Sequence, residues 1–201
     1  MASVELLNID CMEYMATCKD KQFDLAIVDP PYGIGGGLKG GRPFSMSGGD
    51  KWDNPPDETY FRELFLISAN QIIWGGNYFK LGRTRGYVIW DKKNDGRDFS
   101  ESEFAWTSFD RPARTFRYRF IGNKDTKHPT EKPIALYKWL LKNYAKEGDR
   151  IIDTHLGSGS SAIAAYDFGC EFIGCEIDKD YYEAALKRFN NYKLQQKLAF
   201  K

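Results

Sequence analysis

The chain has 201 residues, of which 42% are hydrophobic, 15% are aromatic and 28% are charged, and its formal net charge is +1. A disordered tail would have few aromatic residues and a large net charge, so this composition predicts a folded protein. The length fits one domain over residues 1–201, and the charge balance argues against a strongly basic nucleic-acid-binding protein.

The sequence also indicates where in the cell the protein is located. The sequence contains no hydrophobic run long enough to span a bilayer, and its N-terminus lacks the basic and apolar segments of a secretory signal. Cysteines 11, 18, 170 and 175 match no CxxC metal site, and only His128 and His155 could supplement them. We expect a cytoplasmic protein without a membrane partner and without a bound metal.

The first half of the chain predicts a strand over residues 5–9, a helix over 10–18 and a strand over 23–29. The last of these is an almost continuous apolar run ended by two prolines, which is typical of a strand buried on both faces of a parallel sheet. Residues 33–56 are rich in Gly, Ser and Pro and far exceed the usual length of a connection, so they are predicted to form a lid loop.

The rest of the chain continues the alternation. A helix is predicted over 57–70, followed by strands over 71–74 and 87–90 and by two strands, 103–109 and 115–121, joined by a turn at 110–113. The remaining predictions are a helix over 133–145, a strand over 150–153, a helix over 160–168, a strand over 171–176 and a helix over 180–196. This order predicts an α/β fold with a Rossmann-like, doubly wound, mostly parallel sheet and an antiparallel strand near one edge.

The C-terminal unit has features of a nucleoside site. Gly157 and Gly159 lie between a strand and a helix, and Glu176 follows at about the 20-residue spacing at which an acid accepts hydrogen bonds from ribose hydroxyls. The third glycine of the dinucleotide motif is missing, which favours a ligand with a ribose but without a pyrophosphate. The alternative is an ordinary strand–helix turn with a surface glutamate.

A second motif, Asp29-Pro30-Pro31-Tyr32, closes the buried strand. The prolines fix the backbone, so the Asp29 side chain and the Pro30 carbonyl become rigid hydrogen-bond acceptors beside the aromatic ring of Tyr32. Such a group can hold a planar base and localise the lone pair of its exocyclic amino nitrogen. The alternative is a Pro-Pro turn that only ends a strand.

Together these motifs resemble the amino-group DNA methyltransferases that use S-adenosylmethionine, in the permuted, beta-type order in which the catalytic motif comes first. Asp29-Pro-Pro-Tyr32 is similar to the catalytic motif, and His128-Pro-Thr-Glu-Lys-Pro133 to the segment before the helix that contacts the methionine part of the cofactor. Asp153-Thr-His-Leu-Gly-Ser-Gly-Ser160 resembles the cofactor loop, although Thr154-His155 replaces the usual Pro-Phe. Gly174–Asp178 resembles the ribose-binding strand end, and Asn8–Asp10 the acidic turn near the adenine.

The resemblance implies a class I methyltransferase fold with S-adenosylmethionine as cofactor and S-adenosylhomocysteine as product. It implies that the catalytic residues are Asp29, Pro30, Pro31 and Tyr32. The implied cofactor-binding residues are Asp10, Asp29, His128, Thr130, Lys132, Asp153, Leu156, Gly157, Ser158, Gly159, Glu176 and Asp178.

The implied function is methylation of adenine N6 on a base extruded from double-stranded DNA. A catalytic motif that begins with Asp is found mostly with adenine N6, and one that begins with Ser mostly with cytosine N4. Three alternatives stay open: a cytosine-N4 enzyme, an RNA substrate, and a degenerate module that binds a nucleoside without chemistry.

One segment is much more basic than the net charge of the whole chain indicates. Residues 111–132 contain seven basic and two acidic residues, which favours phosphate contact, although a solvated strand face is the alternative. The predicted DNA-binding residues are Lys39, Arg42, Trp52, Arg111, Arg114, Arg117 and Arg119, and the other tryptophans are predicted to lie in the core. Only the lid and about residues 91–127 are left for target recognition, so we expect a short target or a homodimer that adds DNA-binding surface.

Overall fold

The computed structural model describes residues 3–34, 54–96, 100–119 and 131–199. Its strands are β1 (Val4–Asn8), β2 (Phe23–Val28), β3 (Ser68–Trp74), β4 (Tyr87–Asp91), β5 (Ser102–Thr107), β6 (Arg114–Arg117), β7 (Arg150–Asp153) and β8 (Glu171–Glu176). Its helices are α1 (Cys11–Met15), α2 (Glu58–Ile67), α3 (Ile134–Tyr144), α4 (Ser160–Phe168) and α5 (Lys179–Ala199). Within these residues, no helix is long and apolar enough to cross a membrane.

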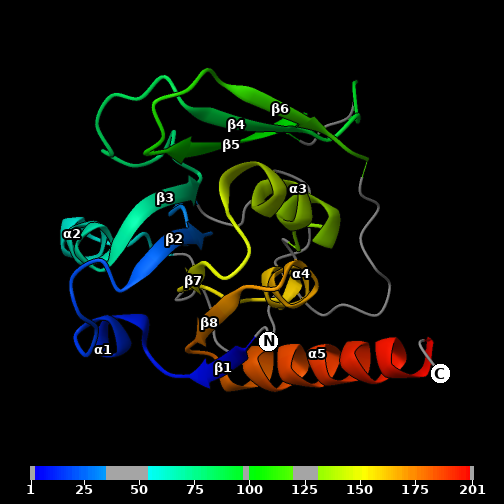
Figure 1. The fold of residues 1–201 in the computed structure, drawn as a ribbon. Coiled ribbons are helices and arrows are strands. Elements are labelled where there is room, and N and C mark those ends of the chain that lie inside the picture. Colours follow the sequence, from blue (N-terminus) through cyan, green and yellow to red (C-terminus); the bar gives the residue numbers. More distant parts are fainter. Residues whose placement is uncertain (1–2, 35–53, 97–99, 120–130, 200–201) are drawn as a thin grey trace.

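The strands form one mixed sheet in the order β1-β8-β7-β2-β3-β5-β4-β6 (Figure 1). The strands from β1 to β3 in this order are parallel, while β5 runs antiparallel to both of its neighbours. The predicted fold class, a mostly parallel doubly wound sheet with an antiparallel strand near one edge, is therefore confirmed. The buried strand β2 lies at the centre, because its apolar side chains face helices on both sides.

One strand pairing differs from the expectation. The two strands predicted on either side of the turn at 110–113 are not neighbours, because β4 lies between β5 and β6 and pairs with both. The second of them is also shorter than predicted and ends at Arg117. The turn therefore crosses over β4, and the three strands form an arm at the far end of the sheet from β1 (Figure 1).

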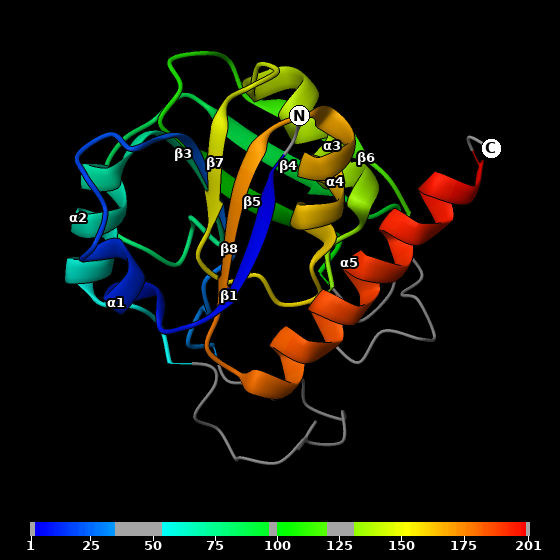
Figure 2. The same ribbon diagram turned by 60° about the horizontal axis from the view of Figure 1, so that its bottom comes forward.

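Helices cover both faces of the sheet, which makes three layers. Figure 2 shows α1 and α2 on one side of the strands and α3, α4 and α5 on the other. Two hydrophobic cores match these layers: one joins the sheet to Tyr60, Leu64 and Ile67 of α2, and the other joins it to α3, α4 and α5. The side chains of Trp74, Trp90 and Trp106 are buried, and Trp139 packs against the second core.

Local sequence signals explain where several helices begin and end. Asp10 and Asp57 accept hydrogen bonds from the first backbone N–H groups of α1 and α2. Helix α4 is bounded by Gly159 and Gly169, which both have the left-handed backbone conformation that glycine adopts most readily. Helix α1 is one turn long and ends at Met15, earlier than the predicted position 18.

Candidate active site and cofactor cavity

The two sequence motifs meet at one edge of the sheet. Strands β1, β8, β7 and β2 are adjacent and parallel, so their C-terminal ends lie together. Asp10 follows β1, Asp29 follows β2, Asp153 ends β7 and Glu176 ends β8. Residues from both ends of the chain thus come to the edge where open parallel sheets bind ligands.

The tetrapeptide after β2 presents a carboxylate with two partners. The Tyr32 hydroxyl donates to Asp29 Oδ1 at 2.7 Å, and the Lys132 ammonium donates to Asp29 Oδ2 at 2.5 Å. Burial, and then the charge of Asp29, raise the pKa of Tyr32 well above its usual value, so the phenol stays neutral and can donate. Pro30 is buried and Pro31 is half-buried, as expected for a turn fixed against the sheet.

The Tyr32 ring is packed closely. Tyr78, whose side chain is half exposed, stacks on it with ring centroids 5.1 Å apart and an interplanar angle of 22°. Phe79 approaches the ring edge-on at 6.2 Å. A β-carbon at Gly75 would lie 2.2 Å from the ring, so only glycine fits at the end of β3. The loop after β3 therefore sets the position of this tyrosine.

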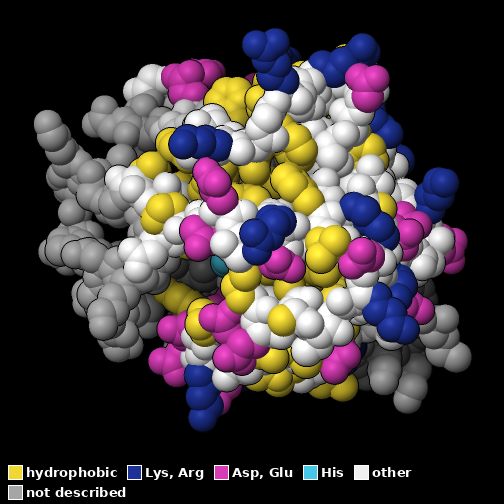
Figure 3. Space-filling view, turned by 90° about the vertical axis from the view of Figure 1, so that its left-hand side faces the viewer, with side chains coloured by type: hydrophobic (Ala, Val, Ile, Leu, Met, Phe, Trp, Pro, Cys, Tyr) yellow, Lys and Arg dark blue, Asp and Glu magenta, His cyan; other side chains and the backbone are white. Residues whose placement is uncertain are grey.

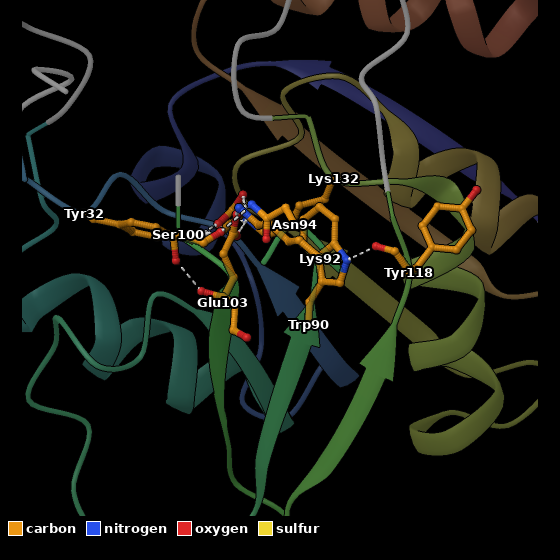
Figure 4. A network of polar contacts seen from close by, with 10 residues as sticks. Tyr32, Trp90, Lys92, Asn94, Ser100, Glu103, Tyr118 and Lys132 are labelled. Atoms are coloured by element: carbon orange, nitrogen blue, oxygen red, sulfur yellow. Dashed lines mark hydrogen bonds and ion pairs between the residues drawn. The ribbon is translucent and has the colours of Figure 1, made fainter. Parts of the chain in front are cut away.

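Lys132, predicted to bind the cofactor, lies in a charged network beside Asp29. Its ammonium is 3.0 Å from Glu103 Oε2 as well as 2.5 Å from Asp29 Oδ2, and it lies over the ring of Trp74 at 5.1 Å. Its side chain is only 3% exposed. Burial alone would lower the pKa of Lys132, but Asp29 and Glu103 raise it above its usual value, so the ammonium is charged. Figure 4 shows Tyr32, Glu103 and Lys132 converging from separate segments.

Glu103 and its partner Lys92 are the residues of this network that the sequence analysis missed. Glu103 lies in β5, and its second oxygen, Oε1, accepts from the Lys92 ammonium at 2.6 Å. Burial alone would raise the pKa of Glu103, but Lys132 and Lys92 lower it to about 2. The only local signal is an acidic residue at the start of a strand that continues with buried residues, and nothing in that signal points to Lys132.

An open cavity of about 390 Å³ lies beside this edge. Its volume falls within the range of small-molecule sites. The predicted cofactor residues Asp10 and Glu176 line it, together with nine residues that the sequence did not single out for binding. These nine are Cys11, Met12, Pro56, Asp57, Thr59, Tyr60, Thr154, His155 and Ile177.

Glu176 connects the cavity to the glycine turn. Its Oε2 accepts from the backbone N–H of Gly157 at 2.9 Å, and its Oε1 accepts from the N–H of Asp178 at 3.0 Å. Gly157 has a φ of +50°, the left-handed conformation that turns this N–H toward the carboxylate. Burial raises the pKa of Glu176. The predicted pair of glycine turn and acid is thus joined directly.

The unusual Thr154-His155 pair takes part in a polar chain. The Tyr60 hydroxyl and Thr154 Oγ1 are 2.6 Å apart, and Thr154 Oγ1 is 2.9 Å from His155 Nδ1. The imidazole also meets the Tyr60 ring edge to face, with centroids 5.4 Å apart. Burial lowers the pKa of His155 to about 4, so the ring is neutral near pH 7.

Three predicted cofactor residues do not line the cavity: Asp153 and Leu156 support the loop from inside, and Asp178 lies at the start of α5. Asp153 accepts from the N–H of His155 at 3.0 Å and from the hydroxyl of Ser161 at 2.6 Å, and burial raises its pKa to about 7. Leu156 is buried beneath the turn. Asp178 is exposed and caps α5 by accepting from the N–H of Asp180 at 2.9 Å.

The remaining part of the loop contacts an ion pair. Arg188 donates to the carbonyl of Ser158 at 2.8 Å and pairs with Glu131 Oε1 at 2.7 Å. The other oxygen of Glu131 is buried and has no hydrogen-bond partner among the described residues. Gly159 has a φ of +75° and begins α4. An unsatisfied acceptor thus lies close to the glycine turn.

The described basic residues predicted to bind DNA fall into two groups. Arg111 donates to the carbonyl of Asn143 at 2.9 Å and lies over the rings of Phe109 and Tyr144, which is a structural role. The other three, Arg114, Arg117 and Arg119, are exposed, although Arg114 donates to Asn143 Oδ1 at 2.6 Å and Arg117 pairs with Asp91 at 3.3 Å. In Figure 3, basic side chains are more frequent along the upper rim, at the height of β4 to β6 in Figure 1, and acidic ones gather lower down.

Several predicted residues lie outside the described residues. They are His128 and Thr130 of the segment before α3, and Lys39, Arg42 and Trp52 of the predicted lid.

Comparisons with known proteins agree with this architecture. The DNA methylase family N6_N4_Mtase matches residues 84–187. The type II methyltransferase M2.DpnII of Streptococcus pneumoniae is 25% identical over 91% of this chain and 88% of its own length. Among solved structures, the M1.HpyAVI–SAM complex has a TM-score of 0.60 with 22% identity, covering 92% of this chain and 99% of that one. The cytosine-N4-specific PvuII DNA methyltransferase has a TM-score of 0.64 with 13% identity, covering 94% and 87%.

The two structural likenesses show the fold, and the family match covers more than half of the chain. The chain therefore belongs to the N6_N4_Mtase family of DNA methylases, the amino-group DNA methyltransferases that use S-adenosylmethionine.

Proposed function

We propose that this protein is a DNA adenine-N6 methyltransferase that acts on a base extruded from the duplex. The family assignment leaves adenine N6 and cytosine N4 open, and the PvuII likeness shows that the fold does not separate them. The choice of adenine rests on the catalytic tetrapeptide, which begins with Asp29 rather than with serine.

One observation carries the proposal: the carboxylate of Asp29 lies at the sheet edge beside an aromatic ring. Its Oδ2 is held by Lys132 at 2.5 Å, and its Oδ1 accepts from Tyr32 at 2.7 Å. A carboxylate oxygen has more than one lone pair, so Oδ1 can accept from an amino group of a target base as well. Asp29 remains 18% exposed, which leaves a path to it.

The chemistry follows from this acceptor. Two hydrogen bonds from the amino group, to Asp29 and to the carbonyl of Pro30, localise the nitrogen lone pair that the aromatic ring otherwise delocalises. When bound, S-adenosylmethionine supplies an electrophilic methyl group on a positively charged sulfur. As the nitrogen–carbon bond forms, the sulfur–carbon bond breaks with its electron pair going to sulfur, and the surplus amino proton is lost to water. Asp29 holds the nitrogen in line for this displacement.

The cavity is proposed to hold part of the cofactor. The carboxylates of Asp10 and Glu176 are proposed to accept from the adenine amino group and the ribose hydroxyls, respectively, because these groups are donors. The unpaired, buried oxygen of Glu131 is proposed to accept from the ammonium of the methionine part. The backbone of Gly157, Ser158 and Gly159 is proposed to border the same ligand, while Asp153 and Leu156 support the turn.

Base entry requires a movement at Tyr32. A base cannot be inserted between two rings whose centroids are 5.1 Å apart, so Tyr78 must swing out before a base can stack on that face of Tyr32. The half-exposed position of Tyr78 permits this movement. We further propose that residues 33–56 close over the base and that residues 91–127 contact DNA through Arg114, Arg117 and Arg119. We also propose a homodimer, which would add DNA-binding surface.

The test is to incubate the purified chain with double-stranded DNA and S-adenosylmethionine and to analyse the nucleosides by mass spectrometry. We expect N6-methyladenine, and we expect Asp29→Ala to abolish it while S-adenosylhomocysteine affinity changes by less than about threefold. The control is Asp20→Ala, an exposed acid in a turn.

Other outcomes separate the alternatives. N4-methylcytosine would establish the cytosine-N4 enzyme. Cofactor binding without any methylated base would establish a non-catalytic module. Activity retained in the Asp29→Ala variant would refute the proposed site.

A further inference from the structure

The charged network beside Asp29 contains two residues to which the proposed mechanism gives no task. Glu103 and Lys92 lie at the ends of β5 and β4 that face the catalytic tetrapeptide, outside all the motifs of the sequence. Glu103 uses one carboxylate oxygen for Lys132 at 3.0 Å and the other for Lys92 at 2.6 Å. Lys92 also lies over the ring of Trp90 at 5.1 Å, which limits its position.

The geometry shows what Glu103 adds to the pair of Lys132 and Asp29. A lysine ammonium carries three donors on a flexible stem, so a single acceptor would leave it free to rotate. Glu103 is a strong acceptor besides Asp29, the Tyr32 hydroxyl is a longer contact at 3.4 Å, and the Trp74 ring lies beneath, so Glu103 restricts the position of the Lys132 ammonium. That position fixes Asp29 Oδ2 and leaves Oδ1 directed toward Tyr32.

The charges in this network also balance. Two carboxylates, Asp29 and Glu103, face two ammonium groups, Lys132 and Lys92. A buried charge without a partner is costly, so Glu103 permits Lys132 to stay charged at a site that is nearly closed to water.

We propose that Glu103, held by Lys92, is a positioning residue for methyl transfer: it fixes the Lys132 ammonium so that Asp29 presents Oδ1, which also accepts from Tyr32, to the amino group of the base. This inference rests on the proposed function of Asp29. It assigns the arm of β4 and β5 a part in the chemistry besides its predicted contact with DNA.

The pH dependence of the reaction separates positioning from a merely structural ion pair. The titratable groups that face Lys132 are Asp29 and Tyr32 after β2, Glu103 on β5 and Tyr137 on α3. Glu103 is one of the two carboxylates that raise the pKa of Lys132. When Glu103 loses its charge, less of the effect of burial on Lys132 is offset. The pKa of Lys132 then falls, and its ammonium loses its proton at a lower pH.

The experiment compares Glu103→Gln with the wild type in methylation of duplex DNA at saturating cofactor and DNA. Glutamine keeps the size of the side chain but removes its charge. We expect kcat to fall on the order of 10- to 100-fold, because misplacement of a catalytic group by about 1 Å has effects of this size. The KM values for S-adenosylmethionine and DNA should change by less than about threefold. The alkaline limb of the profile of kcat against pH should move to lower pH.

Two further variants complete the design. Glu101→Gln is the matched control, since this exposed acid lies two residues away and its side chain accepts from the backbone N–H of Gly96 at 3.3 Å, outside the charged network. Lys92→Gln weakens the hold on Glu103 without leaving the network empty, and it should lower kcat less than Glu103→Gln does. If Glu103→Gln fails to fold, Lys92→Gln tests the proposal in its place. An unchanged kcat in Lys92→Gln then refutes the proposal.

The outcomes distinguish this inference from the proposed function. A wild type that methylates no DNA refutes the function of Asp29. An active wild type whose kcat and alkaline limb are both matched by Glu103→Gln refutes the positioning role of Glu103 alone.

Discussion

The glycine turn and the charged network solve the task of positioning a group in different ways. At the turn, the Glu176 side chain is fixed by backbone groups, because it accepts from the N–H groups of Gly157 and Asp178 within one strand–turn–helix–strand unit. In the network, Asp29, Glu103 and Lys132 come from three separate segments and are held by charged side chains. One site is built within a single supersecondary unit, and the other from segments that lie far apart in the sequence.

The difference has consequences for how each region tolerates change. A side chain at the turn can be altered while the backbone that shapes it remains. In the network, removing one member leaves a buried charge without its partner, so the damage reaches the others. Substitutions in the network should therefore affect both stability and activity, whereas a change of Glu176, which is held by backbone N–H groups, should mainly affect binding.

The largest effect is expected for Lys132→Met. The change leaves two carboxylates facing each other, so we expect a loss of about 3–5 kcal/mol in the free energy of unfolding. We expect methyl transfer to fall by at least about a thousandfold, since Asp29 loses its orientation. Urea unfolding and single-turnover methylation measure the two effects.

The control for this substitution is Lys138→Met, which breaks an ion pair with Asp167 in which the lysine side chain is 47% exposed. It should cost less than about 1 kcal/mol. If Lys132→Met retained methyl transfer within about tenfold of the wild type, the contrast between the two regions would not hold.

An intermediate effect is expected for Glu176→Gln. The variant keeps an oxygen for one backbone N–H but loses the charge that favours a ribose hydroxyl, so we expect the affinity for S-adenosylhomocysteine to fall about tenfold. At saturating cofactor, kcat should stay within about twofold. Calorimetric titration checks the affinity, with Glu171→Gln at the exposed start of β8 as control. A fall in kcat without a change in affinity would assign Glu176 to the reaction instead.

The smallest effect on activity is expected for His155→Phe, which restores the residue usual in the resembling family. We expect cofactor affinity to change by less than about threefold, while the stability changes its response to acid. Burial lowers the pKa of His155 from 6.5 to about 4, so between these values the unfolded chain binds a proton that the folded chain does not. This group therefore makes the wild type lose stability as the pH falls from 6.5 to 4.

Comparing the wild type with His155→Phe isolates the contribution of His155 to this dependence of stability on pH. Asp153, with a pKa raised to about 7, has the opposite dependence and is present in both proteins. Urea unfolding at pH 7 and at pH 4.5 should show a smaller acid loss in His155→Phe than in the wild type. An equal loss in the two proteins would mean that the imidazole is not held neutral.

Much of the fold could be predicted because its signals are local. The predicted bounds of the last two strands and of the helix between them coincide with those of β7, α4 and β8. Glycines, prolines and apolar runs mark these elements within a few residues. The pairing of β4 with both β5 and β6 could not be predicted. The backbone groups of β5 could be paired equally well by β4 or by β6, so the sequence does not show which strand lies beside it.

The same limit applies to the candidate site. The acid after the glycines, Glu176, could be predicted from spacing because the strand–turn–helix–strand unit fixes where it lies. The partnership of Glu103 with Lys132 could not, because it depends on contact between residues of two elements that no spacing rule connects. The sequence marks His155 as a departure from the family pattern, but its hydrogen bond to Thr154 depends on side-chain orientations that the sequence does not give.

Gly75, after β3, and Tyr32, after β2, lie in close contact, and this contact also limits how the two positions can change in evolution. Any side chain at position 75 would overlap the phenol ring, so such a change requires a smaller residue at position 32. The two positions cannot drift independently, and a family alignment should show them varying as a pair or not at all. The position of the Tyr32 ring therefore depends on the absence of a side chain at Gly75.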